Sequence, residues 1–557
     1  MKHSVIAIGL DAADPTLIET WMAQGHLKTL QRLRDRGTYG RLTNSQYYKA
    51  ETPWTTFLTG CLPEKTGYWA PLKFREGTYE VDEVQAYDFA EYPPFYALGQ
   101  DYRVAVFDMP QSVLTDQANG PQVLAWGAHS PQTPTHSLPE SFLQTLCDRH
   151  GKHPALHKDH GDWWDQTYLT RLQKNLKQGI KRRISICREI LQHDQWDLFL
   201  TVFGEPHSAG HDFWYLSQPD HPLHAHRSGI DGDPLLDVFK EMDRAIGEIV
   251  SDVPDDTYVM VFAAHGSGNN TTDVSSMMFL PEFLYRFSFP GQVMLAPGKA
   301  GAPVPPVVTS PRRKTWSGEI WERKHEPNLL KRLLRRQLPT KFHPYLDTVL
   351  GRARQPDLVS PQTLQEQGHF MAWQPTLWYS PLWPQMQAFA IPSFSEGYIR
   401  INLAGREPDG IVAPDDYETL CNSLTHELKQ LVNARTGKPV VKTVIQPRLS
   451  AGDRHPKRPD ADLIVIWSDE PADVVDHPKF GRIGPVPYRR TGSHRGRGFL
   501  IATGPGIEPQ STLPEKHAVD LAPTILHLMG VPIPDYFDGT PILQPSVSQL
   551  ATPQLHQ

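Results

Sequence analysis

The stretch Val5-Ile-Ala-Ile-Gly-Leu10 is a short and almost continuous apolar run, and four similar runs follow it along the chain. Runs of this kind are typical of strands that are buried on both faces of a parallel sheet. Helical patterns separate the runs, and this alternation predicts an α/β fold with a doubly wound, mostly parallel sheet and helices on both of its faces. The other predicted strands are 103–107, 196–203, 258–263 and 463–467, and the predicted helices are 15–22, 27–36, 164–192, 234–250 and 417–432.

Polar residues follow the predicted strands at the point where each strand ends. Asp11 comes directly after the first strand, His207 lies just beyond the third, and His265 follows the fourth. Asp108 and Asp469 hold similar positions after the other two strands. In open α/β sheets, ligands bind beyond the carboxyl ends of the strands, so these residues predict a site at that edge of the sheet.

The composition is that of a globular protein. Of 557 residues, 39% are hydrophobic and 21% are charged, and the formal net charge is −7, so the charge does not favour nucleic acid as a partner. The four cysteines lie far apart in the sequence, which fits a reducing compartment better than a disulfide framework. No apolar run reaches the roughly 18 residues that span a bilayer, and we expect a cytoplasmic protein with no transmembrane segment. The oligomeric state stays open.

The segment Glu51-Thr-Pro-Trp-Thr-Thr-Phe-Leu-Thr-Gly60 predicts a helix that begins at Pro53, because proline suits the first helical position. Thr52 is then the residue just before the helix, where a side-chain oxygen faces unpaired N–H groups. Those N–H groups and the positive end of the helix dipole stabilise an oxyanion. The Thr52 hydroxyl can therefore act as a nucleophile if a metal or a base removes its proton. An ordinary threonine cap would have the same sequence.

Four histidines are candidate metal ligands. His207 and His211 are four residues apart, so in a helix both imidazoles project from one face. Two such nitrogens suit a tetrahedral metal ion if further ligands come from elsewhere in the chain. His265 follows a buried strand in a glycine-rich turn, and His494 lies in the polar segment before another apolar stretch. Each histidine taken alone has an equally good explanation as a surface or turn residue.

Taken in order, these segments resemble the alkaline phosphatase superfamily, and within it the type I phosphodiesterase / nucleotide pyrophosphatase family. The resemblance extends from residue 5 to about residue 542, and residues 291–392 are the poorly matching part. The segments that carry it are Gly9-Leu-Asp11, Thr52, Phe57-Leu-Thr-Gly60, Pro63-Glu-Lys-Thr-Gly67, Glu205-Pro-His-Ser-Ala-Gly-His211, His265-Gly266, Gly397-Tyr-Ile-Arg-Ile-Asn-Leu-Ala-Gly-Arg-Glu407, His494, Gly504-Pro-Gly506, Val519-Asp-Leu-Ala-Pro-Thr-Ile-Leu526, Gly530-Val-Pro-Ile-Pro534 and Asp538-Gly539.

The resemblance implies one catalytic core that is built from two separated parts of the chain. Residues 1–290 and 393–545 would form this alkaline-phosphatase-like core, because segments from both ends carry the resemblance. Residues 291–392 are rich in proline and tryptophan, and the alternation of strands and helices fades there, which predicts an inserted cap. Residues 546–557 are expected to form a flexible tail.

The resemblance also implies a site with two divalent metal ions, usually zinc, with manganese as the alternative. A metal-activated Thr52 would attack phosphorus in line and form a phospho-threonine, which water then hydrolyses. Arg489, Arg490 or Arg495 could pair with phosphate oxygens, although surface positions are the simpler explanation. The implied ligands are Asp11, Thr52 and His265 for one ion and His207, His211 and His494 for the other.

Three positions depart from the family pattern. The family commonly has Asp where this chain has His207, so the ligand is kept with one negative charge fewer, as in the three-nitrogen sites of catalytic zinc. Ala264 stands where the family commonly has an Asp ligand, which leaves three protein ligands for the ion at Asp11. The spacing from Thr52 to Gly60 is shorter than usual, and Thr55 is therefore the alternative nucleophile.

We therefore expect a metal-dependent phosphohydrolase that acts on a small phosphorylated substrate, a phosphodiester or a nucleotide pyrophosphate. Two alternatives stay open. The same phospho-threonine could pass its phosphoryl group to an alcohol, which would make the protein a transferase or mutase. A non-catalytic binding protein on a degraded hydrolase fold is the other alternative, and Ala264 motivates it.

Overall fold

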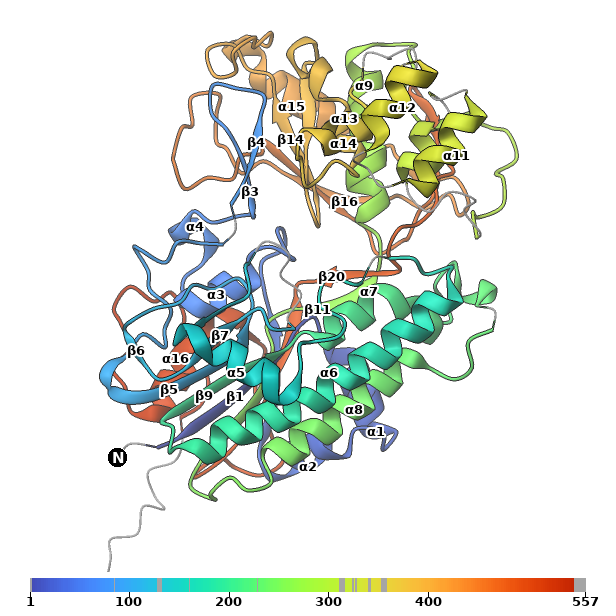
Figure 1. Cartoon of the computed structure of the whole chain (residues 1–557). Helices are drawn as coiled ribbons and strands as arrows, with labels where there is room; N and C mark the ends of the chain where they lie inside the picture. The colour runs from blue at the N-terminus through green and yellow to red at the C-terminus, as the bar shows by residue number, and fades with distance from the viewer. Residues whose placement is uncertain are drawn as a thin grey trace, which may run out of the picture.

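The computed structural model describes residues 3–544 except 85, 128–132, 160, 228, 310–315, 323–324, 326–327, 339–341 and 352–357. The predicted tail at 546–557 lies outside the described residues. At the centre is an 11-stranded sheet, which forms the lower part of the molecule in Figure 1. Its strand order is β22 (Ser511–Thr512), β2 (Thr38–Thr43), β21 (Arg497–Thr503), β10 (Tyr258–Ala263), β1 (Val5–Leu10), β9 (Leu198–Phe203), β5 (Gly99–Met109), β7 (Gln122–Leu124) and β8 (His136–Leu138), with β23 (Lys516–His517) beside β2 and β6 (Ala118–Asn119) beside β5.

The sheet is mostly parallel. Strand β1 pairs in parallel with both β10 and β9, and β9 pairs in parallel with β5. Strand β21 comes from the far end of the sequence and runs antiparallel between β10 and β2. These pairings confirm the predicted doubly wound, alkaline-phosphatase-like sheet and join the two ends of the chain in one core.

Helices cover both faces of this sheet. The alternating residues of β1 separate into two buried clusters, with Ile6 and Ile8 on one face and Val5 and Ala7 on the other. The first face packs against α1 (Pro15–Ala23), α2 (Lys28–Arg36), α5 (Glu140–His150), α6 (Gln166–His193), α7 (Glu205–Ser217) and α8 (Pro234–Ile249), and the second against α3 (Pro53–Thr59) and α16 (Leu521–Met529).

Two smaller antiparallel sheets form the upper layer of the molecule in Figure 1, together with the helices around them. The first sheet has the order β13 (Ala388–Ile391), β14 (Gly397–Ile401), β17 (Leu463–Trp467) and β16 (Val441–Ile445), and the second has the order β12 (Pro297–Gly298), β19 (Gly481–Ile483), β18 (Val475–His477) and β15 (Val432–Asn433). The helices of this layer are α9 (Leu280–Ser288), α11 (Leu329–Gln337), α12 (His343–Leu350), α13 (Pro361–Glu366), α14 (Pro375–Trp378) and α15 (Tyr417–Leu428).

The predicted strand 463–467 is present, but its predicted place in the central parallel sheet is wrong. As β17 it pairs antiparallel with β14 and β16 in the upper layer. An apolar run alone cannot tell a parallel core strand from an antiparallel strand that is buried on both sides. Asp469 therefore does not follow a strand of the central sheet. The predicted boundaries of the cap, 291–392, stay a prediction.

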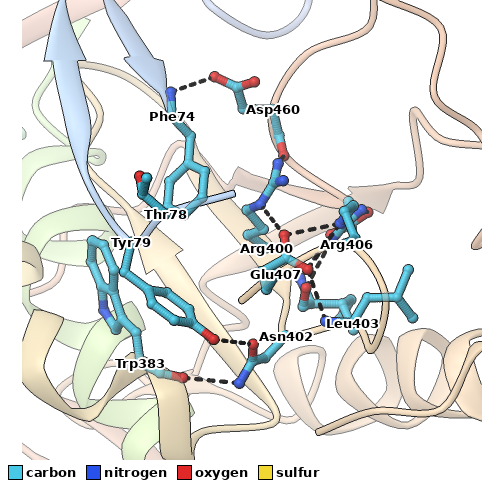
Figure 2. A network of polar contacts seen from close by, with 12 residues as sticks. Phe74, Thr78, Tyr79, Trp383, Arg400, Asn402, Leu403, Arg406, Glu407 and Asp460 are labelled. Carbon is cyan, nitrogen blue, oxygen red and sulfur yellow. Dashed lines mark hydrogen bonds and ion pairs between the residues drawn. The ribbon is translucent and has the colours of Figure 1, made fainter. Parts of the chain in front are cut away.

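A hairpin from the N-terminal half also reaches the upper layer. It consists of β3 (Leu72–Phe74) and β4 (Val81–Glu83), which pair antiparallel. Figure 2 shows how polar contacts fix it: the Phe74 N–H donates to Asp460 at 2.8 Å, and the Tyr79 hydroxyl donates to Asn402 at 2.8 Å. In the part of the chain that the structure describes, no helix is long and apolar enough to cross a membrane.

Candidate metal centre

The strand ends and one helix bring four histidines and a carboxylate together. Asp11 follows β1, and His207 and His211 lie on the first two turns of α7, as the spacing predicted. His265 follows β10 and leads into β11 (Gly266–Asn269), which pairs antiparallel with β20 (Gly492–Arg495). In this register Ser267 lies opposite His494, so the two-stranded sheet delivers His494 beside His265. All five residues are buried.

The two histidines of α7, His207 and His211, approach each other with the same ring nitrogen, Nε2. Nδ1 of His207 lies 3.0 Å from the Asp11 carboxylate, and Nδ1 of His211 lies 2.8 Å from the Gly492 carbonyl. Both partners only accept hydrogen bonds, so each Nδ1 carries the hydrogen and each Nε2 presents a lone pair. The two Nε2 atoms are 2.9 Å apart. Arg490 also reaches the Nε2 of His211, at 3.1 Å, and two acceptor nitrogens this close to each other suit a shared proton or metal cation.

His494 completes a group of three nitrogen donors. One ligand atom from each of His207, His211 and His494 can be chosen so that all lie within 4.8 Å of one another. Burial is the main reason that the pKa of His494 lies well below its usual value, and the neighbouring histidines lower it further. The imidazole is therefore neutral at physiological pH, which is the form that binds a metal.

The Asp11 carboxylate contacts two of the four histidines and the indole of Trp54. It accepts hydrogen bonds from Trp54 Nε1 at 3.0 Å and from His207, and it lies 3.1 Å from Nε2 of His265. Burial alone would raise the pKa of Asp11, but His207 and then His265 hold it well below its usual value. Asp11 is thus ionised and orients both imidazoles, as carboxylates commonly do behind metal-bound histidines.

Thr52 is connected to this cluster through its neighbour Trp54. Helix α3 begins at Pro53, as predicted, but the Thr52 side chain does not cap it. Its hydroxyl donates instead to the Tyr48 carbonyl at 3.1 Å. The Trp54 indole, two residues further on, donates to Asp11. The hydroxyl of Thr55 is buried and finds no hydrogen-bond partner among the described residues.

Of the three predicted arginines, Arg490 lies closest to the histidines. Its guanidinium pairs with both oxygens of buried Asp273 at 2.7 and 2.8 Å, and it reaches His211 Nε2 at 3.1 Å. Arg495 bonds backbone carbonyls and pairs with Asp469. Arg489 stacks on the Trp373 ring at 3.9 Å. The partner Asp273 was not predicted, because nothing in its local sequence marks it.

Glycine allows helix α7 and strand β20 to approach closely enough for the His211 contact. A Cβ atom on Gly492 would lie 2.2 Å from the Gly210 carbonyl oxygen, so no side chain fits there. The Gly492 carbonyl is the acceptor for His211 Nδ1. The two glycines thereby set the direction of the His211 imidazole.

A second buried polar cluster lies next to the first, and sequence reasoning missed it. Arg183 of α6 pairs with Asp108 at 2.5 Å and with Glu205 at 3.3 Å, and His153 lies 3.2 Å from Glu205. The rings of Phe203, Trp126 and Phe107 surround the Arg183 guanidinium at 4.8–5.6 Å. Asp108 was predicted to follow the strand 103–107, but it lies within β5, which extends to Met109, and Glu205 is the first residue of α7. Both carboxylates pair with this internal cation. Only a helical pattern marked Arg183 in the sequence.

The mostly parallel sheet, with polar residues gathered at one edge, has the form that the resemblance to the alkaline phosphatase superfamily predicted. The model of the family described as type I phosphodiesterase / nucleotide pyrophosphatase matches residues 5–300, and the chain belongs to this family. The protein is accordingly an enzyme that hydrolyses phosphoric ester or anhydride bonds. No curated protein matches the chain in sequence.

Among solved structures, a phosphonoacetate hydrolase from Sinorhizobium meliloti 1021, in complex with phosphonoacetate, is similar to this chain. The similarity covers 95% of this chain and 96% of that one, with 12% identity and a TM-score of 0.46.

Proposed function

We propose that the chain is a metal-dependent phosphohydrolase whose cation is held by His207, His211 and His494. The observation that carries the proposal is the buried group of His207, His211 and His494, whose ligand atoms lie within 4.8 Å of one another, with the Nε2 atoms of His207 and His211 2.9 Å apart. Ligand atoms around tetrahedral zinc lie roughly 3.3 Å apart, given bonds of about 2.0–2.1 Å, so this pair is already close to the required separation. Three imidazoles favour zinc over magnesium.

A divalent metal bound there supplies Lewis acidity that lowers the pKa of a hydroxyl and offsets the charge of a phosphoryl group. Asp11 orients His207 from behind, and Arg490, which Asp273 holds beside His211, would bind phosphate oxygens.

The second predicted ion, with Asp11, Thr52 and His265 as ligands, stays a prediction. Asp11 and His265 lie 3.1 Å apart, which suits two ligands of one ion. Ala264 withholds the Asp ligand that the family commonly has.

Thr52 is the proposed nucleophile. Its hydroxyl oxygen would form a bond to phosphorus as the leaving oxygen departs, and water would then cleave the phospho-threonine and restore the hydroxyl. The bond from Trp54 to Asp11, which joins the start of α3 to the histidine cluster, supports this role. The Thr52 hydroxyl itself donates to the Tyr48 carbonyl. Thr55 is the alternative, since its buried hydroxyl has no hydrogen-bond partner in the described part of the chain.

The test combines metal analysis with a panel of aryl phosphate diesters, aryl phosphate monoesters and aryl sulfates, assayed with zinc and with manganese. We expect bound metal and hydrolysis of phosphate diesters. Added alcohol acceptors distinguish a hydrolase from a transferase, because a transferase would give a phosphorylated alcohol. A protein that binds no metal and turns over none of these esters contradicts the proposal and fits a binding protein.

Variants of one short helix identify the nucleophile. Thr52→Ala should abolish turnover, while Thr52→Ser should retain part of it, because serine keeps the hydroxyl. Thr56→Ala is the matched control, since Thr56 is a buried threonine of the same helix. Loss of turnover in Thr55→Ala with full activity in Thr52→Ala would transfer the role to Thr55. The cytoplasmic location also stays a prediction.

A further inference from the structure

The large apolar side chains that face solvent gather at one end of the molecule. Among the described residues twelve such side chains are exposed, and seven of them lie between residues 329 and 349. This segment contains α11 and α12, which Figure 1 shows at an outer corner of the upper layer, away from the central sheet. Exposed apolar groups that cluster in this way mark a surface that contacts another molecule or a membrane. We call these seven residues the apolar face: Leu329, Leu330, Leu333, Leu338, Phe342, Tyr345 and Val349.

The apolar face follows the helical period. In α11, Leu329, Leu330 and Leu333 lie on one side of the helix, and Leu329 is 72% exposed. In α12, Tyr345 and Val349 are four residues apart and are 69% and 60% exposed. Both helices thus turn apolar side chains that are one turn apart towards solvent.

Contacts inside the protein fix this orientation. Lys331 of α11 is buried, and its ammonium donates at 2.7 Å to the carbonyl of Gly351, the residue that follows α12. The Asn328 side chain caps α11 by accepting the Lys331 N–H at 3.1 Å. On α12, Leu346 is buried and holds the helix against the protein. Because a polar residue of α11 bonds to the end of α12, the three exposed leucines are left for a partner outside the chain.

The same end of the molecule is rich in positive charge, in contrast to the chain as a whole. Helix α11 carries Lys331, Arg332, Arg335 and Arg336 and no acidic residue, and α12 adds one acidic residue, Asp347. The whole chain has a formal net charge of −7. A partner that complements this surface is therefore both apolar and anionic.

A second copy of this chain does not complement the surface. In a two-fold dimer the same surface meets itself, so the basic helices would be brought together. A helix with leucines on one side and basic residues on the other is instead typical of segments that lie in the plane of a membrane. Such helices insert residues like Phe342, and tyrosine, here Tyr345, is enriched where hydrocarbon meets the headgroups.

We propose that the apolar face docks the protein, as a peripheral contact, on a membrane that contains anionic lipids. The exposed leucines of α11 and the exposed residues of α12 enter the boundary between headgroups and hydrocarbon. Arg332, which is partly exposed, pairs with lipid phosphates. None of these residues belongs to the candidate metal centre, so the inference goes beyond the proposed function and can be tested without metal or turnover.

Vesicle flotation of the full chain tests the contact. One set of vesicles contains phosphatidylcholine alone, and the other contains about 30% phosphatidylglycerol, an anionic lipid. We expect binding to the anionic vesicles to be at least about tenfold tighter at about 0.1 M salt, and this preference should fall at about 1 M salt because screening is stronger. Equal binding to both sets of vesicles, or binding to neither, overturns the proposal.

The variant that combines Leu329→Gln, Leu330→Gln and Leu333→Gln tests the apolar part of the contact. It should bind the anionic vesicles at least about tenfold more weakly, because the polar side chains no longer enter the lipid. Its denaturant unfolding should match that of the wild type, since the three side chains are exposed.

The matched control combines Val293→Gln, Ile411→Gln and Leu449→Gln. These three apolar residues are exposed as well but lie outside the apolar face. The control should bind vesicles as the wild type does. Equal binding of the control and the leucine variant overturns the proposal.

Arg332→Gln tests the role of charge. It should weaken binding to the anionic vesicles about fivefold, since each basic residue near an anionic surface contributes about that factor, and it should leave binding to neutral vesicles unchanged. Arg332→Lys, which keeps the charge, should bind as the wild type does. An unchanged preference for anionic vesicles in Arg332→Gln contradicts the choice of an anionic membrane.

Sedimentation velocity tests the competing occupant, a second copy of the chain. If the wild type associates with itself, the leucine variant does not, and neither floats with vesicles, the apolar face is an interface between copies and the membrane proposal is wrong. Flotation of the wild type together with the same sedimentation behaviour of both proteins supports the membrane contact.

Discussion

Two buried polar clusters lie side by side at the carboxyl ends of the central strands, and they balance charge in different ways. The arginine cluster consists of Arg183, Asp108, Glu205 and His153 and contains its own permanent cation. The histidine cluster consists of Asp11, His207, His211, His265 and His494, and its histidines turn nitrogen lone pairs towards each other.

The difference teaches how a metal site can be distinguished from a structural ion pair. Both clusters are buried, both lie near the ends of central strands, and both contain carboxylates and histidine. Carboxylates that meet a buried arginine are neutralised by the protein itself. In the histidine cluster Arg490 reaches one ring, at Nε2 of His211, and we propose that a metal cation from solution joins the three imidazoles. Glu205 belongs to the arginine cluster and His207 to the histidine cluster, although they are only two residues apart on α7.

The largest effect is expected from His211→Gln. This variant removes one of three nitrogen donors, and we expect kcat/KM to fall roughly a thousandfold, because metal catalysis supplies several kcal/mol. Metal content, measured by mass spectrometry on the dialysed protein, should fall in parallel. Removal of metal with a chelator should reproduce the loss in the wild type, and added zinc should reverse it.

His221→Gln is the control for that variant. His221 is also buried, but it bonds to the Thr491 carbonyl and to the Leu223 N–H rather than to another histidine. It should keep the metal content of the wild type. An equal loss of metal in both variants would remove the distinction between the clusters.

Arg183→Met should act on stability instead. It leaves Asp108 and Glu205 buried without their cation, and breaking such a pair costs about 3–5 kcal/mol in the free energy of unfolding. Denaturant unfolding measures this loss. Arg188→Met, which removes an exposed pair with Asp252, should cost at most about 1 kcal/mol. If Arg183→Met unfolds like the wild type, the arginine cluster is not neutralised as described.

The pH dependence of stability should depend on His221, a buried histidine that belongs to neither cluster. Burial lowers the pKa of His221 to about 4, from an ordinary value of 6.5. Because the folded pKa is the lower one, His221 contributes stability above pH 6.5, and this contribution is lost as the pH falls towards 4. The loss amounts to roughly 3 kcal/mol, at about 1.36 kcal/mol per pKa unit. Denaturant unfolding between pH 4 and 7 should show a shallower acid decline in His221→Gln.

The smallest effect is expected from Asp11→Asn. The amide still lies behind His207 but no longer carries the charge that orients the imidazole, and we expect metal affinity to fall about 10- to 100-fold. Titration with zinc in the presence of a competing chelator measures this change. Asp14→Asn is the control, because Asp14 caps α1 and pairs with Arg497 at 2.8 Å. Loss of one whole ion per chain in Asp11→Asn would make Asp11 a direct ligand.

The sequence predicted the sheet, its two-sided cover and the residues that meet at its edge. Buried parallel strands leave continuous apolar runs, and the histidine spacing on α7 follows from the helical period. Asp11, His265 and His494 could be placed because each adjoins such a run. The sheet to which β17 belongs was predicted wrongly, because its apolar run would be the same in either sheet.

Other features depend on partners far away in the sequence. The bond from Trp54 to Asp11 spans 43 residues, and Arg490 meets Asp273 across 217. The contact between Tyr48 and Tyr398 spans 350 residues. No local pattern specifies such contacts, since each residue alone would be an ordinary core tyrosine, tryptophan or aspartate.

The position of β21 has a consequence for how the chain is made on the ribosome. This strand fills the space between β10 and β2, so both neighbours have an open edge until residue 503 has been synthesised. Open strand edges pair readily with other chains, which makes incomplete products prone to aggregation. A product that lacks about the last eighth of the chain, from residue 488 onward, has neither β21 nor His494, and we expect it to be inactive.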